Sequence, residues 1–276
     1  MTLPDPKPAP AMLTPVQADE YIRQHVAVLE RESTSLANLA GKVLRQEVRA
    51  ERDQPPFDRV TMDGVALCSR AAIEGRRVFA LQGVQGAGAR PLGLLDAGNC
   101  IEIMTGAVLP AGCDCVIPTE KLVIASGVVN ISPAVAVTPW LNVHRRGFDG
   151  HANDLLISPG VRLGATHIAV IASAGLPFVE VTRNPRIMVI STGDELIEPG
   201  NPIEEWQIRS SNGHAIGATL KSAGFADVEH AHLTDEPRSM RQRLQGYLDD
   251  HDVLVLSGGV SMGRFDFVPE IGRAHV

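Results

Sequence analysis

The chain opens with a proline-rich stretch, which gives way to a helical pattern of apolar residues. Residues 1–12 hold four prolines and no apolar periodicity, which predicts a disordered or extended tail. Thr14 and Pro15 are then a typical helix N-cap and first helical residue. The apolar residues that follow share one helical stripe, namely Ala18, Tyr21, Ile22, Val26 and Leu29. We therefore predict an amphipathic helix that packs on another surface.

Between Val78 and Val143 the pattern changes to short runs of β-forming residues separated by glycine. The runs read RVFALQGV, NCIEIMTG, DCVIPTEKLVI and GVVNISPAVAV. Ala125, Ser126 and Gly127 stand between two alternating runs, as the loop of a β-hairpin does. We predict a separate, mostly antiparallel β domain that extends over residues 51–146.

From Arg186 onward, strand and helix patterns alternate. The strand-like segments read RIMVIS, ADVEHAHL and DVLVLSGG, and the helical segments read SSNGHAIGATLKSAG, ending at Gly224, and PRSMRQRLQGYLDD. This alternation is typical of βαβ units, which form parallel sheets and bind ligands beyond the carboxyl ends of the strands. We predict an α/β domain with a parallel sheet over residues 185–270.

Residues 13–50 and 147–184 fit neither pattern. The second segment holds a helix-like stretch, ATHIAVIASAG, and a short strand-like one, FVEVTR. Because the two segments flank the β domain, we assign them to one discontinuous connecting domain of α+β type. The predicted fold class is α/β multidomain, with a mostly antiparallel β domain inserted in the connecting domain and followed by the parallel-sheet domain.

Composition supports a folded protein and excludes several partners. The 276 residues exceed one ordinary domain, and 44% of them are hydrophobic. A net charge of −7 argues against a broad surface for nucleic acid or anionic membranes. Without a signal-peptide pattern or a long apolar run, we expect a cytoplasmic protein. The four cysteines are interpreted as small buried residues: Cys68, Cys100, Cys113 and Cys115.

Two loops after predicted strands carry candidate chemistry. Gly258 and Gly259, flanked by Ser257 and Ser261, form a glycine-rich loop whose backbone N–H groups could approach a phosphate, although a tight turn is the alternative. The loop lacks the lysine of a P-loop. The other loop, residues 192–195, reads TGDE and places two carboxylates at a strand end.

Further acids follow the other predicted strands. Asp235 and Asp266 would join Asp194 and Glu195 at one edge of the sheet. Several acids beside a phosphate require a hard cation, so this combination predicts Mg²⁺. The alternative is that Asp194 or Glu195 merely caps the next segment. The adjacent Arg145 and Arg146 suit an oxyanion, although exposure to solvent is the commoner fate of such a pair.

Six segments together closely resemble the molybdopterin molybdenumtransferases of the MoeA type, which are related to the gephyrin E domain. In chain order they read PPFDRVTMDG, MTGAVLPAGCD, RRGFD, STGDEL, SSN and SGGVSMGRFDFV. The resemblance implies a homodimer that inserts molybdate into adenylylated molybdopterin, hydrolyses the adenylate with Mg²⁺ and releases AMP. It also implies a molybdopterin adenylyltransferase as partner. Molybdate and tungstate are too alike for the sequence to separate them.

The resemblance further implies roles for individual residues. By motif position, the functional acids are Asp63, Asp149, Glu195, Asp235 and Asp266, and the last three of them would hold Mg²⁺. The residues implied to bind the pterin substrate lie in three loops: Thr105, Thr192, Gly193, Asp194, Ser257, Gly258, Gly259 and Ser261.

Family members continue beyond this chain with the rest of the α/β domain, a lysine-bearing loop and a small β domain. Residues 271–276 also match the translation of a common sequencing adapter, so we predict a non-native tail there, an incomplete α/β domain, and a chain that is inactive as written. Two alternatives to the enzyme remain. One is an inactive scaffold or binding module of the same fold, and the other is a nucleotide-dependent phosphotransferase that uses the glycine loop.

Overall fold

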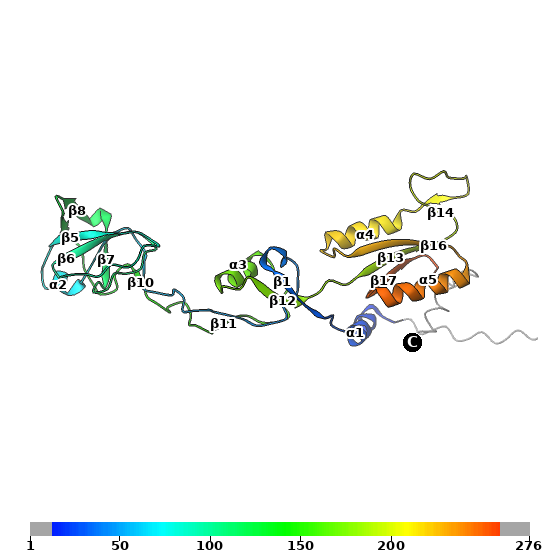
Figure 1. Cartoon of the computed structure of the whole chain (residues 1–276), viewed down its shortest axis with the longest axis horizontal. Coiled ribbons are helices and arrows are strands. Elements are labelled where there is room, and N and C mark those ends of the chain that lie inside the picture. The colour runs from blue at the N-terminus through cyan, green and yellow to red at the C-terminus, as the bar shows by residue number, and fades with distance from the viewer. Residues whose placement is uncertain (1–12, 260–276) are drawn as a thin grey trace, which may run out of the picture. The chain divides into compact units, whose positions relative to one another are not determined.

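The computed structural model describes residues 13–259, which fall into two compact units (Figure 1). The β unit comprises residues 46–161 and 165–177, and the α/β unit comprises residues 13–45, 162–164 and 178–259. Ser261, Asp266 and both predicted tails lie outside the described residues.

A six-stranded sheet with the strand order β7-β4-β6-β5-β9-β8 is the basis of the β unit. Its strands are β4 (Gly64–Leu67), β5 (Val78–Gln85), β6 (Asn99–Ile103), β7 (Cys115–Pro118), β8 (Leu122–Ala125) and β9 (Val128–Ile131). All neighbours pair antiparallel except β5 and β6, which are parallel. The predicted, mostly antiparallel architecture is confirmed.

The hairpin between β8 and β9 follows directly from its turn residues. Ala125 pairs with Val128, which leaves Ser126 and Gly127 as a two-residue turn. Both turn residues have positive φ, 52° and 75°. This geometry matches the right-handed twist of the strands and favours glycine at the second position. The predicted hairpin loop is therefore confirmed.

Two hydrophobic clusters fill the β unit, one on each side of β4. Val65 and Leu67 belong to one cluster, whereas Ala66 between them belongs to the other. Successive side chains of a strand point to opposite faces, so a strand with both faces covered has an uninterrupted apolar sequence. All four residues of β4 are accordingly buried.

The cysteines contribute to these clusters as small apolar residues. All four are free, and Cys100, Cys113 and Cys115 are buried. Burial raises the pKa of Cys100 to about 11 and that of Cys113 to about 12, and it also raises the pKa of Cys115. Thiols that stay protonated are poor metal ligands and poor nucleophiles. The interpretation as small buried residues is confirmed for these three, whereas Cys68 is half-buried.

Short elements complete the β unit. It also contains two pairs of short strands and three helical elements. These elements are β2 (Val48–Arg49) with β11 (Leu155–Ile157), β3 (Arg59–Val60) with β10 (Val143–His144), α2 (Ser69–Ile73), η2 (Thr119–Lys121) and α3 (Ala165–Ser173).

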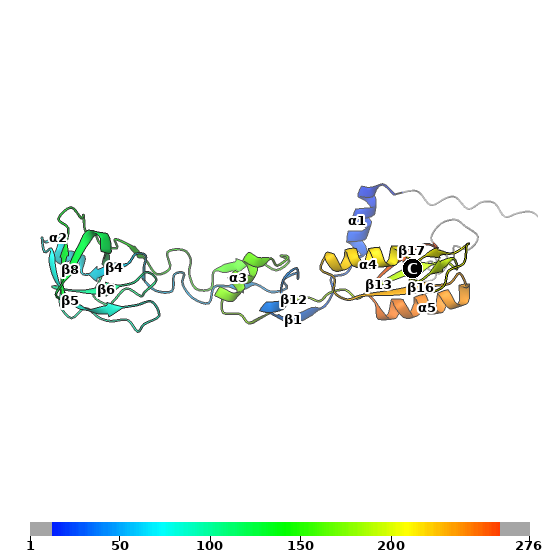
Figure 2. The same cartoon turned by 90° about the horizontal axis from the view of Figure 1, so that it is seen from above.

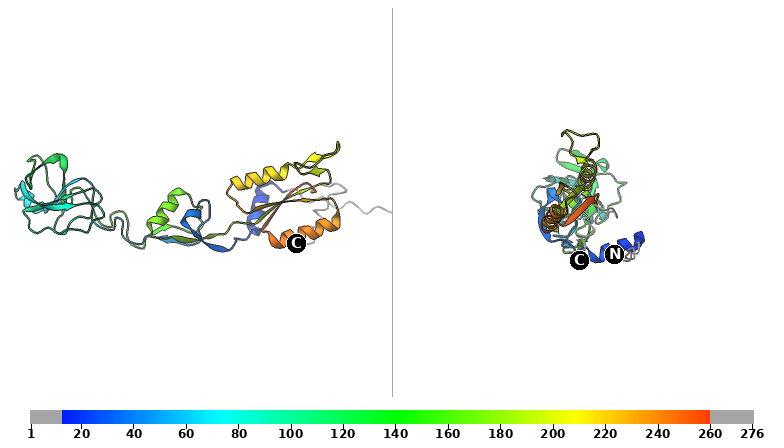
Figure 3. Two further views of the ribbon diagram at one scale, coloured as in Figure 1. Left: turned by 45° about the horizontal axis from the view of Figure 1, so that its top comes forward. Right: turned by 90° about the vertical axis from the view of Figure 1, so that its right-hand side faces the viewer.

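The α/β unit contains a three-stranded parallel sheet in the order β16-β13-β17. Its strands are β13 (Ile187–Thr192), β16 (Val228–Leu233) and β17 (Val253–Ser257), joined by α4 (Asn212–Ser222) and α5 (Pro237–Asp250). Every residue of the central β13 is buried. The two helices lie on opposite faces of the sheet in all side views (Figures 1, 2 and 3). The predicted βαβ pattern is confirmed.

Both helices of this sheet have the ends that their sequences predict. Pro237 is the first residue of α5, and the carboxylate of Glu236 accepts hydrogen bonds from the backbone N–H groups of the first turn. Gly224, just beyond α4, has a φ of +97°, which glycine adopts without strain. Met240 and Leu244 of α5 are buried in the cluster against the sheet.

A second strand pair precedes the parallel sheet. β1 (Arg31–Ser35) pairs antiparallel with β12 (Phe178–Thr182). The turn after β12 is fixed by Arg183, which donates to both carboxylate oxygens of Asp252 at 2.6 and 2.8 Å and to Glu30 at 2.6 Å. The hydrogen bonds from Arg183, and next that from the backbone N–H of Arg186, hold the pKa of Asp252 well below its usual range. The remaining elements are η1 (Leu36–Asn38), β14 (Leu196–Ile197) and β15 (Ile208–Arg209).

The N-terminal helix α1 (Pro15–His25) begins as predicted, with a capping box between Thr14 and Gln17. It ends before the last two residues of the predicted stripe. None of its residues is buried by the described part of the chain, so the surface on which it is predicted to pack does not lie within residues 13–259. Among residues 13–259, no helix is both long and apolar enough to cross a membrane.

Candidate functional site

Asp63 and Thr105, which are 42 residues apart, meet in the β unit. The backbone N–H and the hydroxyl of Thr105 both donate to Asp63 Oδ1, each at 2.7 Å. These bonds, the one from the backbone first and the one from the hydroxyl second, lower the pKa of Asp63. The exposed carboxylate is therefore ionised and held in one orientation.

Two glycines next to these residues make the contact possible. A Cβ on Gly64 would lie 1.9 Å from the carbonyl oxygen of Ile117, because β4 and β7 approach closely there. Gly106 has a φ of +85° and donates its N–H to the Val60 carbonyl at 2.8 Å. The glycines of the M-D-G and M-T-G motifs are thus required by the backbone.

Asp149 is held in a different way. Its backbone N–H donates to the Gln54 carbonyl at 2.8 Å. Its Oδ1 lies 3.1 Å from His144 Nε2, and His144 Nδ1 lies 3.1 Å from a guanidinium nitrogen of Arg59. Half of the Asp149 side chain is exposed. Its carboxylate therefore combines one imidazole partner with access to solvent.

The neighbouring arginine pair is already engaged by the protein. Arg146 Nε donates to Asp53 Oδ2 at 2.7 Å, and the Arg145 guanidinium lies 4.6 Å from the centroid of the Trp140 ring. Hydrogen bonds from the Ala152 backbone and then from Arg146 lower the pKa of Asp53. Arg146 is thus committed to a carboxylate, which weighs against the interpretation of the pair as a free oxyanion site.

In the α/β unit, the loops after β13 and β16 meet. Asp194 Oδ1 accepts a hydrogen bond from the backbone N–H of Asp235 at 3.1 Å. The Glu195 carboxylate folds back over Gly193, where an added Cβ would lie 2.6 Å from Glu195 Oε2. Asp194 thus supports the loop after β16, which is not the next segment of the chain that the capping alternative concerns.

These loops also contain two of the three predicted Mg²⁺ ligands, Glu195 and Asp235. Both offer carboxylate oxygens, which is the donor chemistry that Mg²⁺ prefers. Glu195 is exposed and Asp235 is partly exposed, so water can complete a coordination shell. The third predicted ligand, Asp266, lies outside the described residues. The donors that are described fit the ion.

The predicted glycine loop approaches the end of β13. Gly258 has a φ of +96°, and a Cβ there would lie 2.6 Å from Thr192 Oγ1 and 2.8 Å from the Thr192 carbonyl oxygen. Gly259 also has a positive φ, 64°. Ser257 Oγ accepts a hydrogen bond from Asn212 Nδ2 at 3.1 Å. The loops after β13 and β17 can approach each other because Gly258 has no side chain.

A polar cavity of about 140 Å³ lies beside this contact. Four of its lining residues are serines. The full lining is Ser191, Leu196, Ile208, Arg209, Ser210, Ser211, Asn212 and Ser257. Within residues 13–259, the buried hydroxyls of Ser191 and Thr192 have no hydrogen-bond partner. An unpaired buried hydroxyl costs about 1–3 kcal/mol, so these groups are suited to a bound polar ligand.

The cavity also contains the N-terminus of α4. Ser211 is the N-cap of this helix and makes no side-chain capping bond. The N–H groups of a first helical turn and the helix dipole both favour anions. Sequence reasoning missed Ser191, Ser210 and Asn212 as candidates. The signal was the S-S-N segment before the helix, which entered the resemblance without an assigned role.

The comparisons with known proteins place the chain in a family. Residues 13–175 match the family described as "MoeA N-terminal region (domain I and II)", and residues 188–276 match "Probable molybdopterin binding domain". A molybdopterin molybdenumtransferase of Synechocystis sp. is 37% identical over 94% of this chain and 67% of that protein. The chain belongs to the MoeA-type molybdopterin molybdenumtransferase family.

Other relatives agree with this assignment. The Staphylococcus epidermidis molybdopterin molybdenumtransferase is 32% identical over 95% of this chain and 64% of that protein. A crystal structure of the molybdopterin biosynthesis MoeA protein of Pyrococcus horikoshii superimposes with a TM-score of 0.80 at 27% identity, covering 95% of this chain and 67% of that one. The chain thus spans about two thirds of the length of these MoeA-type relatives.

Three predictions from the sequence are confirmed by these matches. They are the MoeA-type family, the α/β multidomain fold class and the enzyme class, since the relatives are named as transferases that act on molybdopterin. The cavity lies in the segment that matches the molybdopterin-binding domain, whereas Asp63, Thr105 and Asp149 lie in the N-terminal match.

Proposed function

We propose that this protein inserts molybdate into adenylylated molybdopterin, with Mg²⁺-dependent release of AMP. The observation that carries the proposal is the polar cavity with its unpaired buried hydroxyls, within the segment that matches the molybdopterin-binding domain. An adenylylated pterin has phosphate oxygens that accept several hydrogen bonds at once. Hydroxyl donors and a helix N-terminus are suited to such a group.

The proposed pterin-binding residues surround this cavity. Ser257, Ser210 and Asn212 would donate to the phosphate groups, and the glycines at positions 193, 258 and 259 would let the ligand approach the backbone. Thr192 Oγ1 is a further unpaired donor. Ser261 would extend the same loop. A ligand bound here would satisfy donors that the protein itself leaves unpaired.

Glu195, Asp235 and Asp266 are the proposed Mg²⁺ ligands. A bound Mg²⁺ would neutralise charge on the phosphate oxygens and on the leaving AMP. Asp194 supports the loop of Asp235 through its hydrogen bond to the backbone. Removal of Asp194 is therefore expected to affect the position of a ligand more than its charge.

Asp63 and Asp149 are proposed as the functional acids contributed by the β unit. A carboxylate whose pKa is lowered stays ionised, so Asp63 accepts hydrogen bonds from water or substrate and does not donate. Thr105 holds its orientation through two bonds. Such an acid can orient a water molecule.

A homodimer is the proposed assembly, and a molybdopterin adenylyltransferase is the proposed partner that supplies the substrate in the cytoplasm. Support for the homodimer comes from α1, which has no buried residue within the described chain although Tyr21 and Ile22 form an apolar face. A second copy of the chain would bury that face.

Binding and AMP release test this function separately. Calorimetric titration with adenylylated molybdopterin is expected to show a Ser257→Ala variant weakened by about tenfold, the effect of one lost hydrogen bond to a charged group. Ser222→Ala, at the other end of α4, is the control and should bind normally. Equal affinity of both variants would contradict the assignment of the cavity.

The measurement of AMP release upon molybdate addition separates the enzyme from the scaffold alternative. It requires the chain extended through the residues that its relatives possess. Binding without AMP release would favour a binding module, and ATP turnover without molybdate would favour the phosphotransferase.

A further inference from the structure

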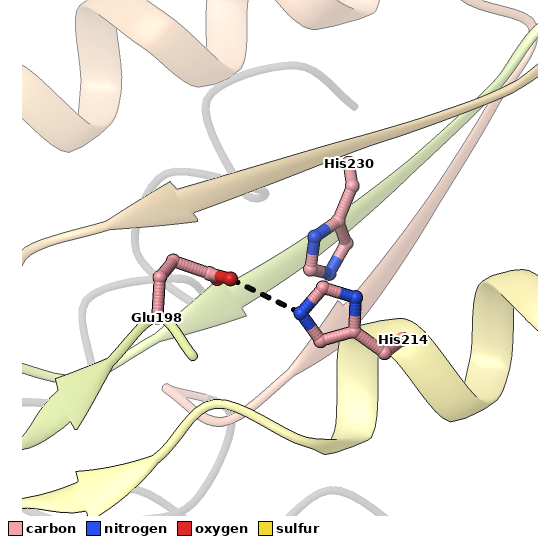
Figure 4. Close-up of side chains that lie close together, drawn as sticks. All are labelled: Glu198, His214 and His230. Atoms are coloured by element: carbon pink, nitrogen blue, oxygen red, sulfur yellow. Dashed lines mark hydrogen bonds and ion pairs between the residues drawn. The ribbon is translucent and has the colours of Figure 1, made fainter. Parts of the chain in front are cut away.

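Three side chains that the proposed reaction does not use converge in the α/β unit. They are Glu198 in the turn after β14, His214 in the first turn of α4 and His230 in β16 (Figure 4). Their ligand atoms all lie within 4.8 Å of one another. Glu198 Oε2 lies 3.0 Å from His214 Nε2, and the two imidazole centroids are 5.0 Å apart.

The backbone permits this arrangement because residue 213 is glycine. A Cβ on Gly213 would lie 1.5 Å from His230 Nε2. The His230 imidazole thus occupies the space over the helix backbone that any side chain at position 213 would take. The strand fixes the other end of the side chain, because His230 pairs in register with Val189 of β13.

We propose that Glu198, His214 and His230 bind a divalent transition metal ion, for which Zn²⁺ is the best match. Two imidazole nitrogens and one carboxylate oxygen are a common Zn²⁺ ligand set, with water as the fourth ligand. Mg²⁺ prefers oxygen donors throughout and does not suit two imidazoles. The site thus differs in chemistry from the acids proposed to hold Mg²⁺.

Exposure and charge both favour an ion at this position. The His214 side chain is 54% exposed and that of Glu198 is 39% exposed, so an ion and its water ligand can enter from solvent. A carboxylate beside two imidazoles supplies the negative charge that a divalent cation favours.

A metal ion here would restrain the segment between β14 and β15. Glu198 lies in that segment, whereas His214 lies on α4 and His230 on β16 of the parallel sheet. Leu196 and Ile208, which flank the segment, line the polar cavity. An ion bound to all three ligands would link this segment, which borders the cavity, to α4 and β16 and so restrict its motion.

Calorimetric titration of the 276-residue chain with Zn²⁺, in excess Mg²⁺, tests the site. We expect one equivalent of Zn²⁺ to bind. His214→Ala, His230→Ala and Glu198→Gln should each weaken binding by at least about tenfold. Glu205→Gln, on the same segment, and His25→Asn, on α1, are the matched controls and should bind normally.

Gly213→Ala sharpens the test because it keeps all three ligands. The three atoms nearest to the added methyl group all belong to the His230 imidazole, which can rotate away. Alanine also favours a helix by about 1 kcal/mol over glycine. This variant should fold with unchanged or higher thermal stability and yet bind Zn²⁺ at least about tenfold more weakly.

Several outcomes would overturn the proposal. Binding that survives in both histidine variants, with circular dichroism showing a native fold, would assign the ion elsewhere. Binding abolished by Cys68→Ser would assign it to a thiol. Hydrogen exchange gives an independent readout, because Zn²⁺ should protect residues 198–208 in the wild type and not in His230→Ala. Equal protection in both would exclude the restraint.

Discussion

The two units differ in whether their buried and functional polar groups have hydrogen-bond partners within the described chain. In the β unit, the Asp63 carboxylate receives two hydrogen bonds from Thr105, and the buried Ser69 hydroxyl donates to Asp114 at 2.6 Å. In the α/β unit, the similarly buried hydroxyls of Ser191 and Thr192 have no partner among residues 13–259. Folding alone satisfies the first set, whereas the second set requires a ligand or water.

Strand direction explains this difference. Antiparallel neighbours such as β4 and β7 pair along their length, and the loops that join them fold back on the sheet. Parallel strands place all their carboxyl ends at one edge, so the polar residues that end β13 and β17 collect there. Such an edge forms a binding site at some cost in stability.

The largest expected effect breaks the β unit at its tightest approach. In Gly64→Ala, the new Cβ would meet the backbone oxygen of Ile117 at 1.9 Å, and neither strand can yield cheaply. We expect a loss of about 4 kcal/mol, which is typical of severe strain in a core. Urea unfolding measures it. Gly83→Ala, whose Cβ would have an ordinary contact at 3.5 Å, is the control, and equal losses would contradict the explanation.

Asp252→Ala should have the next largest effect, in the α/β unit. It removes the acceptor of two Arg183 bonds and leaves the half-buried guanidinium with Glu30 and the Asn184 carbonyl as partners. We expect a loss of about 3 kcal/mol, at the lower end for a buried ion pair because both side chains are partly exposed. Thermal unfolding gives the value. Asp250→Ala, at the end of α5, should cost little.

The sequence predicts those parts of the fold that are determined by residues close together in the chain. The helices α4 and α5 and the turn at Ser126 and Gly127 follow from caps, periodicity and turn residues within a few positions. The polar strand RESTS, β1, lacks such a signal, because its pairing with β12 fixes it from far away. The stripe on α1 predicts an apolar face and not the surface that covers it.

The residues of the candidate site likewise fall into those that a local sequence pattern predicts and those that depend on distant contacts. The loops at residues 192–195 and 257–259 were found because they follow strands whose pattern is clear. The pairing of Asp63 with Thr105 could be reached only through the family resemblance, since no local spacing joins the two. Ser191 and Ser210 were missed because a serine at the end of a strand predicts nothing about its hydrogen bonds.

A matched pair of serine substitutions tests the comparison of the two units directly. Ser69→Ala should cost about 2 kcal/mol, because it removes a bond to a charged acceptor. Ser191→Ala should be neutral or stabilising by up to about 1 kcal/mol, because its hydroxyl has no partner. Both serines are 2% exposed, so burial does not confound the comparison. Equal losses in urea unfolding would mean that water satisfies the Ser191 hydroxyl.

The smallest expected effect concerns how firmly the β unit fixes its acid. Thr105→Val removes the hydroxyl bond to Asp63 and keeps the backbone bond, which contributes more to the lowered pKa. The pKa of Asp63, followed by NMR titration of its carboxyl carbon, should rise only part of the way toward about 3.9, the ordinary value for Asp. Thr119→Val is the control, because its hydroxyl donates to the Asp63 carbonyl and not to the carboxylate.

The same substitution changes the response to acid, with a sign that follows from the lowered pKa. A carboxyl whose pKa is lower in the folded protein than in the unfolded chain contributes stability above the pKa of the unfolded chain. This stability is lost as the pH falls through the pKa of the folded protein. Thr105→Val should therefore be less stable than wild type at neutral pH, and this difference in the free energy of unfolding should shrink as the pH is lowered through this range. The reason is that protonated Asp63 accepts the hydroxyl bond less strongly. A difference that stays constant down to the lowest pH would show that the hydroxyl acts through packing, and the Asp63 carboxylate would then be held by the backbone of residue 105 alone.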